Sequence, residues 1–379
     1  MDFDLTEEQS LLQDSVTKLL AASYSFEQRK AMRAAPGGYS RKMWQQFADL
    51  GLLALPFAEE DGGLGGGAVD VMLLMESFGQ HLVLEPYLAT IVLAGGCLRH
   101  GANVGQRASW LPSLIAGETT WALAHVEREA RFDLNYVRTT ARRDGDAWVL
   151  HGAKSVVLHG DSTDRLLVSA QLEGDTLSGV GLFVVDASAP GVTRRGFPTQ
   201  DGLRAADVSL QGVRVHDDHR LDTADGLATV RHAIDEAVAA SCAEAVGAMQ
   251  RAHEITVDYL KQRKQFGVAI GSFQALQHRA VDMLVMVEQA RSMAYYATMM
   301  VSEPDAAQRS SAMSAAKVQV GRSARFVGEQ AVQLHGGIGV TEECSVGHYY
   351  RRLTLLEILF GDTNHHLAQL AAAGELGGD

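Results

Sequence analysis

The chain has 379 residues, of which 46% are hydrophobic and 21% charged, and its formal net charge is −13. This balance is typical of a soluble globular protein, and the length predicts more than one domain. The negative charge argues against a nucleic-acid partner and against docking on an anionic membrane.

Three widely spaced cysteines, Cys97, Cys242 and Cys344, form no CxxC pair, so neither a disulfide framework nor a cysteine zinc site is expected. The N-terminal segment is acidic and lacks the basic and apolar regions of a secretory signal. No apolar run is long enough to cross a bilayer. A cytoplasmic protein without membrane insertion is therefore expected.

Residues 1–118 are predicted to form an all-helical domain. Thr6 and Gln9 have the spacing of a capping box, and leucines then recur at helical spacing. Further helices are predicted over 41–50, 69–78, 86–100 and 108–116, around a glycine-rich loop at 56–67.

Residues 119–223 are predicted to form a small β-domain, because the hydrophobic period changes near Thr119. Strands are predicted over 121–125, 137–142, 147–151, 166–170 and 181–185. Asp144-Gly145 is a hairpin turn signal between two of them. Gly191, Gly196 and Gly212 are expected to punctuate the later strands.

Residues 224–379 are predicted to form a four-helix bundle. Helices are expected over 228–260, 272–300, 305–335 and 355–373, and the first is well beyond average length. The predicted fold class is therefore α+β: an N-terminal helical domain, a middle β-barrel-like domain and a C-terminal four-helix bundle.

Six short motifs, in order along the whole chain, resemble those of the acyl-CoA dehydrogenase family. They are FDLTEEQ at Phe3–Gln9, EEDGGLG at Glu59–Gly65, RKQFG at Arg263–Gly267, FQALQ at Phe273–Gln277, QLHGGIG at Gln333–Gly339 and the segment Tyr350–Thr363. Two segments, Ala141–Asp161 and Leu353–Ala368, are most similar to the small subunits of pimeloyl-CoA-type dehydrogenases. The resemblance implies an FAD cofactor, an acyl-CoA thioester substrate, a homo- or hetero-tetramer and electron-transfer flavoprotein as electron acceptor.

The resemblance also implies which residues meet the cofactor. In the family FAD lies extended at a dimer interface, and Arg263 and Gln265 would meet the pyrophosphate and ribose of a neighbour's FAD. A guanidinium fork suits phosphate oxygens, and a glutamine offers both a donor and an acceptor. The remaining cofactor-binding residues implied by the motifs are Phe266, Phe273, Gln274, Gln333, Gly336, Gly337 and Thr363. The alternative is that these residues only end helices at the surface.

On the flavin side the chain departs from the family pattern. The family's TEPxAGSD-like loop corresponds to Val126–Asp133, where Arg131 and Phe132 replace a Gly-Ser pair. The following flavin-facing strand reads Ser155–Leu158 and lacks the family's aromatic and hydroxyl residues. The departures imply a lost flavin pocket, and drift within a tolerant loop is the alternative.

The catalytic base is the third departure. Dehydrogenation across Cα–Cβ needs a closely placed carboxylate to take the α-proton. The family's glutamate position is Gly361 here, and the position used by a few members, on the long first helix of the bundle, is Ala237. Asp362 and Glu236 are each one residue away, and Glu236 is expected to be solvated or paired within its helix. The catalytic residue therefore stays unknown.

No metal site is predicted. His365 and His366 are adjacent, so they diverge on a helix, and His151 and His159 lie in predicted strands without carboxylate clusters.

The function predicted from the sequence is an FAD-associated acyl-CoA dehydrogenase subunit that pairs with a catalytic partner and acts on a bulky or dicarboxylic acyl-CoA. One alternative is a homotetrameric enzyme with a displaced base, Asp362 or Glu236. A second alternative is a structural subunit that binds no FAD.

Overall fold

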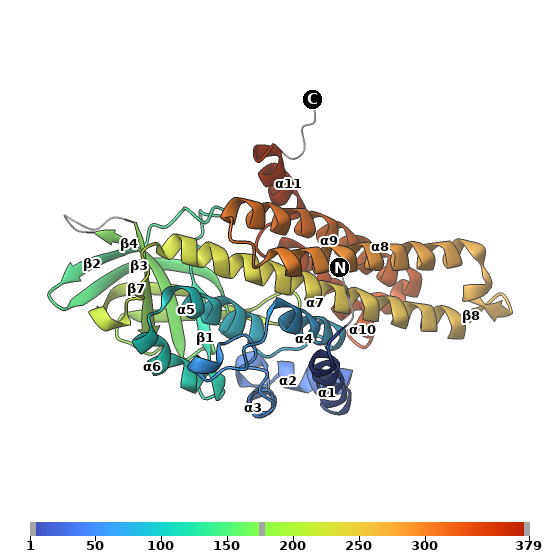
Figure 1. Cartoon of the computed structure of the whole chain (residues 1–379). Coiled ribbons are helices and arrows are strands. Elements are labelled where there is room, and N and C mark those ends of the chain that lie inside the picture. Colours follow the sequence, from blue (N-terminus) through green and yellow to red (C-terminus); the bar gives the residue numbers. More distant parts are fainter. Residues whose placement is uncertain (1–4, 174–178, 375–379) are drawn as a thin grey trace. The chain divides into compact units, whose positions relative to one another are not determined.

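The structure is a computed structural model that describes residues 5–173 and 179–374 (Figure 1). Phe3 and Asp4 of the first predicted motif lie outside the described residues. The chain forms two compact units. The bundle unit comprises the described parts of 1–31, 68–83 and 238–379, and the sheet unit comprises 32–67 and 84–237. The predicted boundaries after residues 118 and 223 stay predictions.

The N-terminal third of the chain is helical, as predicted. Its helices are α1 Glu7–Ser23, α2 Phe26–Arg33, α3 Arg41–Asp49, α4 Ala68–His81, the π-helical segment Leu88–Ala94 that continues into α5 Gly95–Gly101, and α6 Val104–Ile115. Short 3-10 turns lie at Pro36–Gly38 and Glu59–Asp61. The predicted capping box is confirmed, because the Thr6 hydroxyl accepts from the Gln9 backbone N–H and the Gln9 side chain accepts from the Thr6 N–H.

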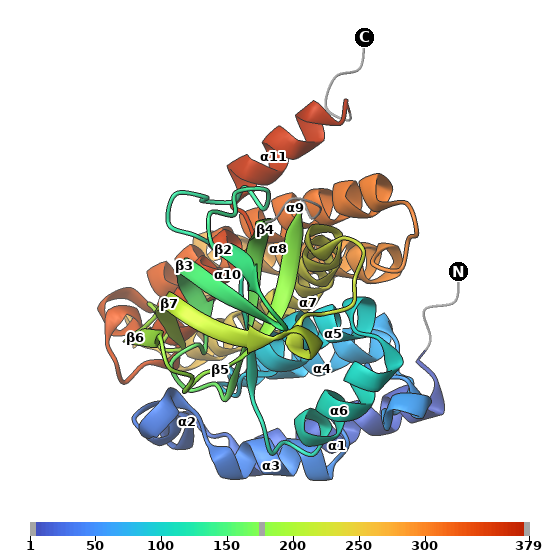
Figure 2. The same ribbon diagram turned by 90° about the vertical axis from the view of Figure 1, so that its left-hand side faces the viewer.

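The sheet unit contains a seven-stranded sheet whose order is β1-β4-β2-β3-β7-β6, with β5 paired to β4 (Figure 2). The strands are β1 Trp121–Ala124, β2 Thr140–Asp144, β3 Ala147–Leu158, β4 Arg165–Glu173, β5 Val180–Asp186, β6 Val192–Pro198 and β7 Arg204–His216. The 3-10 turn Asp217–His219 follows β7. Among the described residues no ladder joins β5 to β6, so the sheet does not close into a complete barrel.

Two turn signals of the sheet have different outcomes. The hairpin at Asp144-Gly145 is confirmed, because Asp144 pairs with Ala147 and Gly145 has a φ of 67°. Gly212 does not separate two strands as expected. It lies inside β7 with a φ of 66°, at the bulge where the register against β3 shifts.

The core of the sheet centres on Trp148, which is fully buried and lies 5.5 Å from Phe183 between ring centroids. The Trp148 indole N–H donates to Asp217 Oδ1 at 2.7 Å, so the one polar atom of the ring is satisfied. Alternating apolar residues of β3, β4, β5 and β7 surround this pair.

The C-terminal helices are α7 Gly226–Gln262, α8 Gln274–Met300, α9 Ala306–His335, α10 Ser345–Ile358 and α11 Thr363–Ala372. The small strands β8 Lys264–Gln265 and β9 Val268–Ala269 and the 3-10 turn Ile270–Ser272 connect α7 to α8, and the turn Gly336–Val340 follows α9. The predicted helix over 355–373 is wrong. Phe360 and Gly361 have φ values of 64° and 119°, which end α10 and separate it from α11.

Within the bundle unit, α4 and α7 cross with their backbones in close contact. A Cβ added at Gly79 would lie 1.9 Å from the Glu244 carbonyl oxygen, and one at Gly247 would lie 1.9 Å from the Glu76 carbonyl oxygen. The Glu244 carboxylate also accepts two bonds of 2.7 Å from Arg352 of α10. Glycine at both crossing positions and this buried ion pair fix α4, α7 and α10 together. No helix in the described part of the chain has the length and hydrophobicity needed to span a membrane.

Candidate functional site

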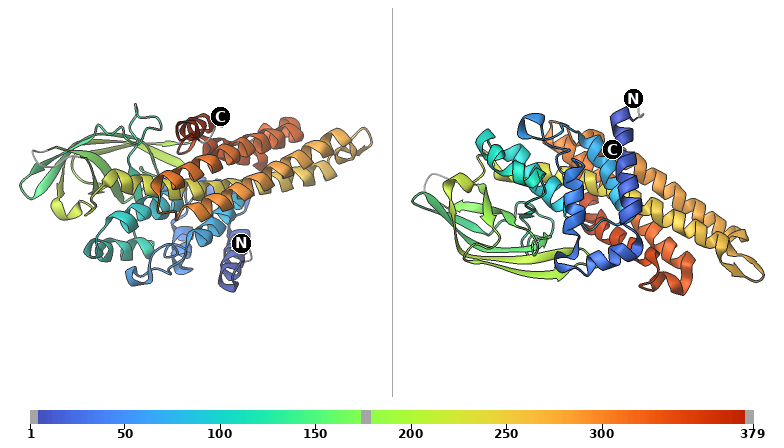
Figure 3. Two further views of the ribbon diagram at one scale, coloured as in Figure 1. Left: turned by 45° about the horizontal axis from the view of Figure 1, so that its top comes forward. Right: turned by 90° about the horizontal axis from the view of Figure 1, so that it is seen from below.

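The predicted pyrophosphate-binding segment forms the tip of a hairpin between α7 and α8, which run side by side in the bundle unit (Figure 3). Phe266 and Gly267 occupy the turn between β8 and β9 with φ values of 55° and 83°. Positive φ at both central residues is the geometry of a type I′ turn, which accounts for the glycine. Arg263 and Gln265 are exposed, and Phe266 is 92% exposed.

Phe273 and Gln274 lie where α8 begins, close to the same tip. Phe273 is 39% exposed and meets Phe266 edge-to-face with ring centroids 6.3 Å apart. Two aromatic side chains and a guanidinium therefore share one exposed surface. Such a group offers apolar and cationic contacts together, as a nucleotide requires.

Gln333, Gly336 and Gly337 lie at the end of α9, next to the base of that hairpin. The connection is the Tyr259 ring of α7, which stacks on His335 at 4.4 Å. Gly336 has a φ of 65°, and a Cβ added at either glycine would meet nothing within 4 Å. The glycine turn therefore leaves open space beside its backbone, which suits close approach of a ligand.

Thr363 is not part of this group. Its hydroxyl and its backbone N–H both donate to Glu357 Oε1, at 2.8 and 3.0 Å. Thr363 lies against Gly321 of α9, and Gly321 is about 22 Å from Gly336 along the helix at 1.5 Å per residue. The predicted cofactor residues thus form one group at the hairpin end and a separate position at the start of α11.

The glutamate position of the family, Gly361, is closed by its own neighbours. A Cβ there would lie 2.6 Å from His365 Cδ2 and 2.7 Å from His366 Nε2. The His366 ring is buried and its Nδ1 lies 3.1 Å from the Ser314 hydroxyl. Burial, reinforced by the Lys317 charge, lowers the pKa of His366 to about 3, so the ring is neutral. A side chain at position 361 is excluded both by the positive φ and by this packing.

Asp362, the first candidate for a displaced base, is the N-cap of α11. Its Oδ1 accepts from the His365 backbone N–H at 2.7 Å. The α10–α11 break consists of residues 359–362, between the end of α10 and the start of α11. On its α10 side, the buried Lys317 ammonium donates to the carbonyls of Leu356 and Glu357. Burial lowers the pKa of Lys317 to about 8. Both ends of the break are therefore held by structural caps.

A pocket beside this break is lined by Lys317, Gly321 and Glu357, among others, and leaves no room for a water molecule. This pocket of the bundle unit is therefore too small for an acyl chain.

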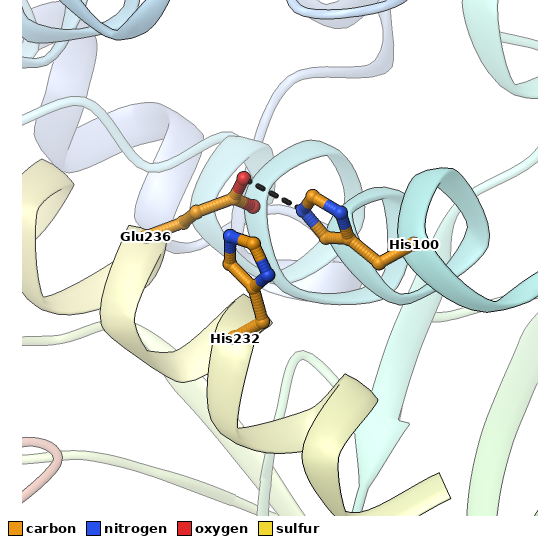
Figure 4. Close-up of side chains that lie close together, drawn as sticks. All are labelled: His100, His232 and Glu236. Atoms are coloured by element: carbon orange, nitrogen blue, oxygen red, sulfur yellow. Dashed lines mark hydrogen bonds and ion pairs between the residues drawn. The ribbon is translucent and has the colours of Figure 1, made fainter. Parts of the chain in front are cut away.

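In the sheet unit, Glu236 is not solvated as one expectation had it, and besides His232 of its own helix it meets residues of α5. Its side chain is 16% exposed and is bound by Arg99 of α5 at 2.8 and 3.2 Å. His100 Nε2 lies 2.9 Å from Glu236 Oε1 (Figure 4). Burial alone would raise the pKa of Glu236, but the His100 bond and the Arg99 charge lower it. The neighbouring Ala237 is fully buried.

The two segments predicted to face a flavin ring lie against each other in the sheet unit. The Ser155 N–H donates to the Val126 carbonyl at 2.8 Å, where a bulge in β3 interrupts the ladder with β7. Arg131 and Val156 both have a φ of 52° and are exposed. The surface therefore presents a guanidinium and apolar side chains where the family pattern has small residues and a hydroxyl.

A buried ion pair between Lys154 and Glu127 lies beneath this surface. The Lys154 ammonium is fully buried and donates to Glu127 Oε1 at 2.8 Å and to the Ser169 hydroxyl at 3.1 Å. Glu127 also accepts from the Thr139 backbone N–H and hydroxyl at 2.9 and 2.8 Å. Burial lowers the pKa of Lys154 to about 8, against the opposing effect of the carboxylate.

Sequence reasoning did not find Lys154, Lys317 or the pairing of Glu236 with α5. The two lysines lie in apolar stretches, which is the only signal of a buried cation that the sequence contains. His232 and Glu236 are four residues apart on α7, so their shared face was visible, but His100 is brought to them only by the fold.

Comparison with known proteins identifies the family of this chain. The acyl-CoA dehydrogenase N-terminal, middle and C-terminal domain models match residues 6–118, 122–214 and 224–374. The chain belongs to the acyl-CoA dehydrogenase family. Family members are FAD-dependent oxidoreductases that act on the CH–CH group of acyl-CoA thioesters.

The chain is 27% identical to the probable acyl-CoA dehydrogenase YngJ of Bacillus subtilis, over 99% of this chain and 100% of that protein. Among solved structures it is similar to a variant of the Tcur3481-Tcur3483 steroid ACAD. That match has 28% identity and a TM-score of 0.87, and it covers 98% of this chain and 99% of that one. The ChsE4-ChsE5 complex of Mycobacterium tuberculosis matches with 24% identity, a TM-score of 0.88 and complete coverage of both chains, which shows the shared fold.

Proposed function

We propose that the chain is a subunit of a heteromeric acyl-CoA dehydrogenase that completes the FAD site of a catalytic partner and has no base of its own. The observation that carries the proposal is the closed position of Gly361. A glutamate there would need a Cβ within 2.7 Å of two histidine rings. The chain has therefore adapted the surrounding packing to the absence of that side chain.

The displaced-base alternative is disfavoured by the bonds of both candidates. A general base needs a free oxygen lone pair directed at the substrate, and a pKa near the working pH. Asp362 caps α11, and Glu236 is engaged by Arg99 and His100, which lower its pKa. Neither carboxylate is placed to take an α-proton without breaking the contacts that hold it.

The residues present suit the ADP half of FAD at the hairpin end of the bundle unit. Arg263 and Gln265 would hold phosphate and ribose, Phe273 would pack on the adenine, and Gly336 and Gly337 leave room for the backbone to approach. When bound, FAD supplies the hydride acceptor for dehydrogenation. In the sheet unit, Arg131 and Val156 occupy the surface that the family uses for the flavin ring, so this half does not suit the cofactor.

Association with a related subunit is supported by the apolar side chains that α8 exposes. Val281, Leu284 and Val285 form one exposed apolar group at helical spacing, and Tyr296 and Met299 form a second one about three turns farther along the helix. Exposed groups of apolar side chains mark interaction surfaces. Two of the similar structures are described as pairs of differently named chains. A heterotetramer in the cytoplasm, passing electrons to electron-transfer flavoprotein, is the assembly that we propose.

The substrate that we propose is a bulky acyl-CoA. The steroid acyl-CoA dehydrogenase with 28% identity supports a polycyclic acyl group. The narrower likeness to small subunits of pimeloyl-CoA-type dehydrogenases stays a prediction, and it favours a dicarboxylic acyl group instead. A panel of a steroid side-chain CoA ester, pimeloyl-CoA and butyryl-CoA distinguishes the two.

The test is turnover with an artificial electron acceptor, first with the chain alone and then after co-expression with the product of the neighbouring open reading frame. We expect a colourless, inactive chain and a yellow, active complex. Activity of the lone chain that is abolished by Asp362→Asn or Glu236→Gln would instead show a displaced base and a homotetramer. A complex that contains no flavin would favour the structural subunit.

A further inference from the structure

In the sheet unit, two histidines and a glutamate converge at a place that the proposed function does not use. His232 and Glu236 lie four residues apart on α7 and so share a face, while His100 comes from the last turn of α5 (Figure 4). One potential ligand atom from each residue lies within 4.8 Å of the other two. We propose that His100, His232 and Glu236 form a binding site for a divalent transition-metal cation of the Zn²⁺ class.

The chemistry of the three side chains favours this class of ion. Imidazole nitrogen and carboxylate oxygen are ligands of Zn²⁺, and two histidines with one glutamate form a known three-ligand set that leaves a fourth position open. His100 has 28% of its side chain exposed, so water reaches the site and can occupy that position. Ca²⁺ and Mg²⁺, which prefer oxygen ligands, are disfavoured.

Two of the three ligand atoms already lie near the separation that an ion requires, and the third must move. Two ligand atoms on a tetrahedral Zn²⁺, each about 2.0–2.1 Å from the metal, lie about 3.3 Å apart. His100 Nε2 and Glu236 Oε1 are 2.9 Å apart, close to that separation. The His100 and His232 rings are stacked at 3.9 Å with an angle of 13° between their planes, so His232 must rotate to direct a nitrogen at the ion.

The contacts between Glu236 and Arg99 indicate which carboxylate oxygen a cation would take. Arg99 holds Glu236 Oε2 at 2.8 Å and makes a longer contact of 3.2 Å with Oε1. Oε1 is therefore the oxygen for the metal, while Arg99 remains on Oε2 as an orienting partner.

Binding of the ion would replace the hydrogen bond between His100 and Glu236 by two metal–ligand bonds, and no redox step is involved. His100 Nε2 now lies at hydrogen-bonding distance from Glu236 Oε1, and a ligating Nε2 has no proton. The imidazole proton moves to Nδ1 or to solvent, and the nitrogen and the oxygen then share the cation. The ion would link α5 to α7 within the sheet unit.

Isothermal titration of the metal-free full-length chain with ZnCl₂ tests the proposal. We expect saturable binding of one Zn²⁺ per chain in the micromolar range. His232→Gln should weaken it at least about tenfold, since even loss of a partner behind the ligands costs about 10–100-fold. The control is His278→Gln, which removes an exposed histidine of α8 outside the cluster and should leave the affinity unchanged.

A second measurement needs no variant. Co²⁺ added to the unaltered chain should give the intense visible absorption of a four-coordinate site, and Zn²⁺ should displace it. Absence of saturable Zn²⁺ binding, a purely octahedral Co²⁺ spectrum, or equal affinity in a folded His232→Gln variant would each overturn the proposal and leave the cluster as an ion pair between α5 and α7.

Discussion

The hairpin end and the α10–α11 break of the bundle unit were both interpreted from the same family resemblance, and they differ in one physical respect. At the hairpin end, Arg263, Gln265 and Phe266 are exposed, and the glycine turn beside them borders open space. At the break, the polar groups are hydrogen-bonded within the chain. Asp362 caps α11, and Thr363 donates to Glu357.

The difference teaches how a subunit can retain half of a shared site. An interface residue must stay available to the partner, so it gains little from contacts in its own chain. A position that no longer meets substrate is free to be filled by local packing, as His365 and His366 fill the space beside Gly361. The hairpin end is thus suited to an external ligand, while the break is internally satisfied.

Replacement of Arg263 should have the largest effect on the cofactor. We expect Arg263→Ala to weaken the binding free energy of FAD in the assembled complex by about 2–5 kcal/mol, which is a loss of affinity of at least about 30-fold. The reason is that a phosphate charge loses its partner. Flavin-to-protein ratio after gel filtration measures it. Lys264→Ala, on the same exposed hairpin, is the matched control and should retain FAD. Unchanged flavin in Arg263→Ala would remove the distinction between the two regions.

Substitution of Gly361 tests the closed side of the comparison. Gly361→Ala should lower the free energy of unfolding by about 2–4 kcal/mol, since both the backbone strain and the contact with two histidine rings must be relieved. Urea unfolding measures it. Gly62→Ala is the control, because Gly62 has a φ of 84° and nothing within 4 Å of an added Cβ. It should cost only the strain, about 1–2 kcal/mol.

Gly361→Glu should be at least as destabilising and should not give the lone chain dehydrogenase activity. A stable, active Gly361→Glu variant would show that the base position is open to substrate.

The fold was largely predictable because its signals are local. The capping box at Thr6 and Gln9, the hairpin turn at Asp144-Gly145 and the alanine-rich pattern of α7 each specify an element without reference to the rest of the chain. The break before Asp362 was not predicted, because leucines at helical spacing on both sides favour one continuous helix. Gly361 and the N-cap residue Asp362 are nevertheless local signals of a helix end and a helix start, and the structure uses both.

The site residues were predictable by type but not by arrangement. The motifs identify Gly336 and Thr363 equally, yet Thr363 lies against Gly321, which is about 22 Å from Gly336 along α9. Glu236 was expected to be solvated or paired within its helix, since helical spacing reveals only neighbours within α7, whereas Arg99 and His100 come from another helix. Contacts between distant segments are fixed by tertiary packing, which no local pattern encodes.

Acid should weaken the α10–α11 break through its buried histidine. The pKa of His366 is about 3 in the fold against an ordinary value of 6.5, so only the unfolded chain takes up the proton as pH falls below 6.5. Stability is therefore lost on acidification, by at most about 2 kcal/mol per site between about pH 6.5 and pH 5.

His366→Gln, which cannot titrate, should flatten that part of the stability profile measured by urea unfolding. The exposed His278 provides the control, and His278→Gln should keep the full slope. An unchanged slope in His366→Gln would show that the ring is not held neutral by the packing around Gly361.

Removal of the Thr363 hydroxyl should have the smallest effect on the cofactor. The hydroxyl proton is donated to Glu357 Oε1 at 2.8 Å, so it is not available to a flavin. Thr363→Val should cost about 1–2 kcal/mol of folding stability through that charged hydrogen bond. FAD retention in the complex should fall by less than about threefold, or about 0.7 kcal/mol. The matched control is Thr354→Val, whose hydroxyl bonds the Tyr350 carbonyl of its own helix. A flavin loss in Thr363→Val as large as that of Arg263→Ala would mean that the break, like the hairpin end, still contacts the cofactor, and the two regions would then belong to one continuous FAD site.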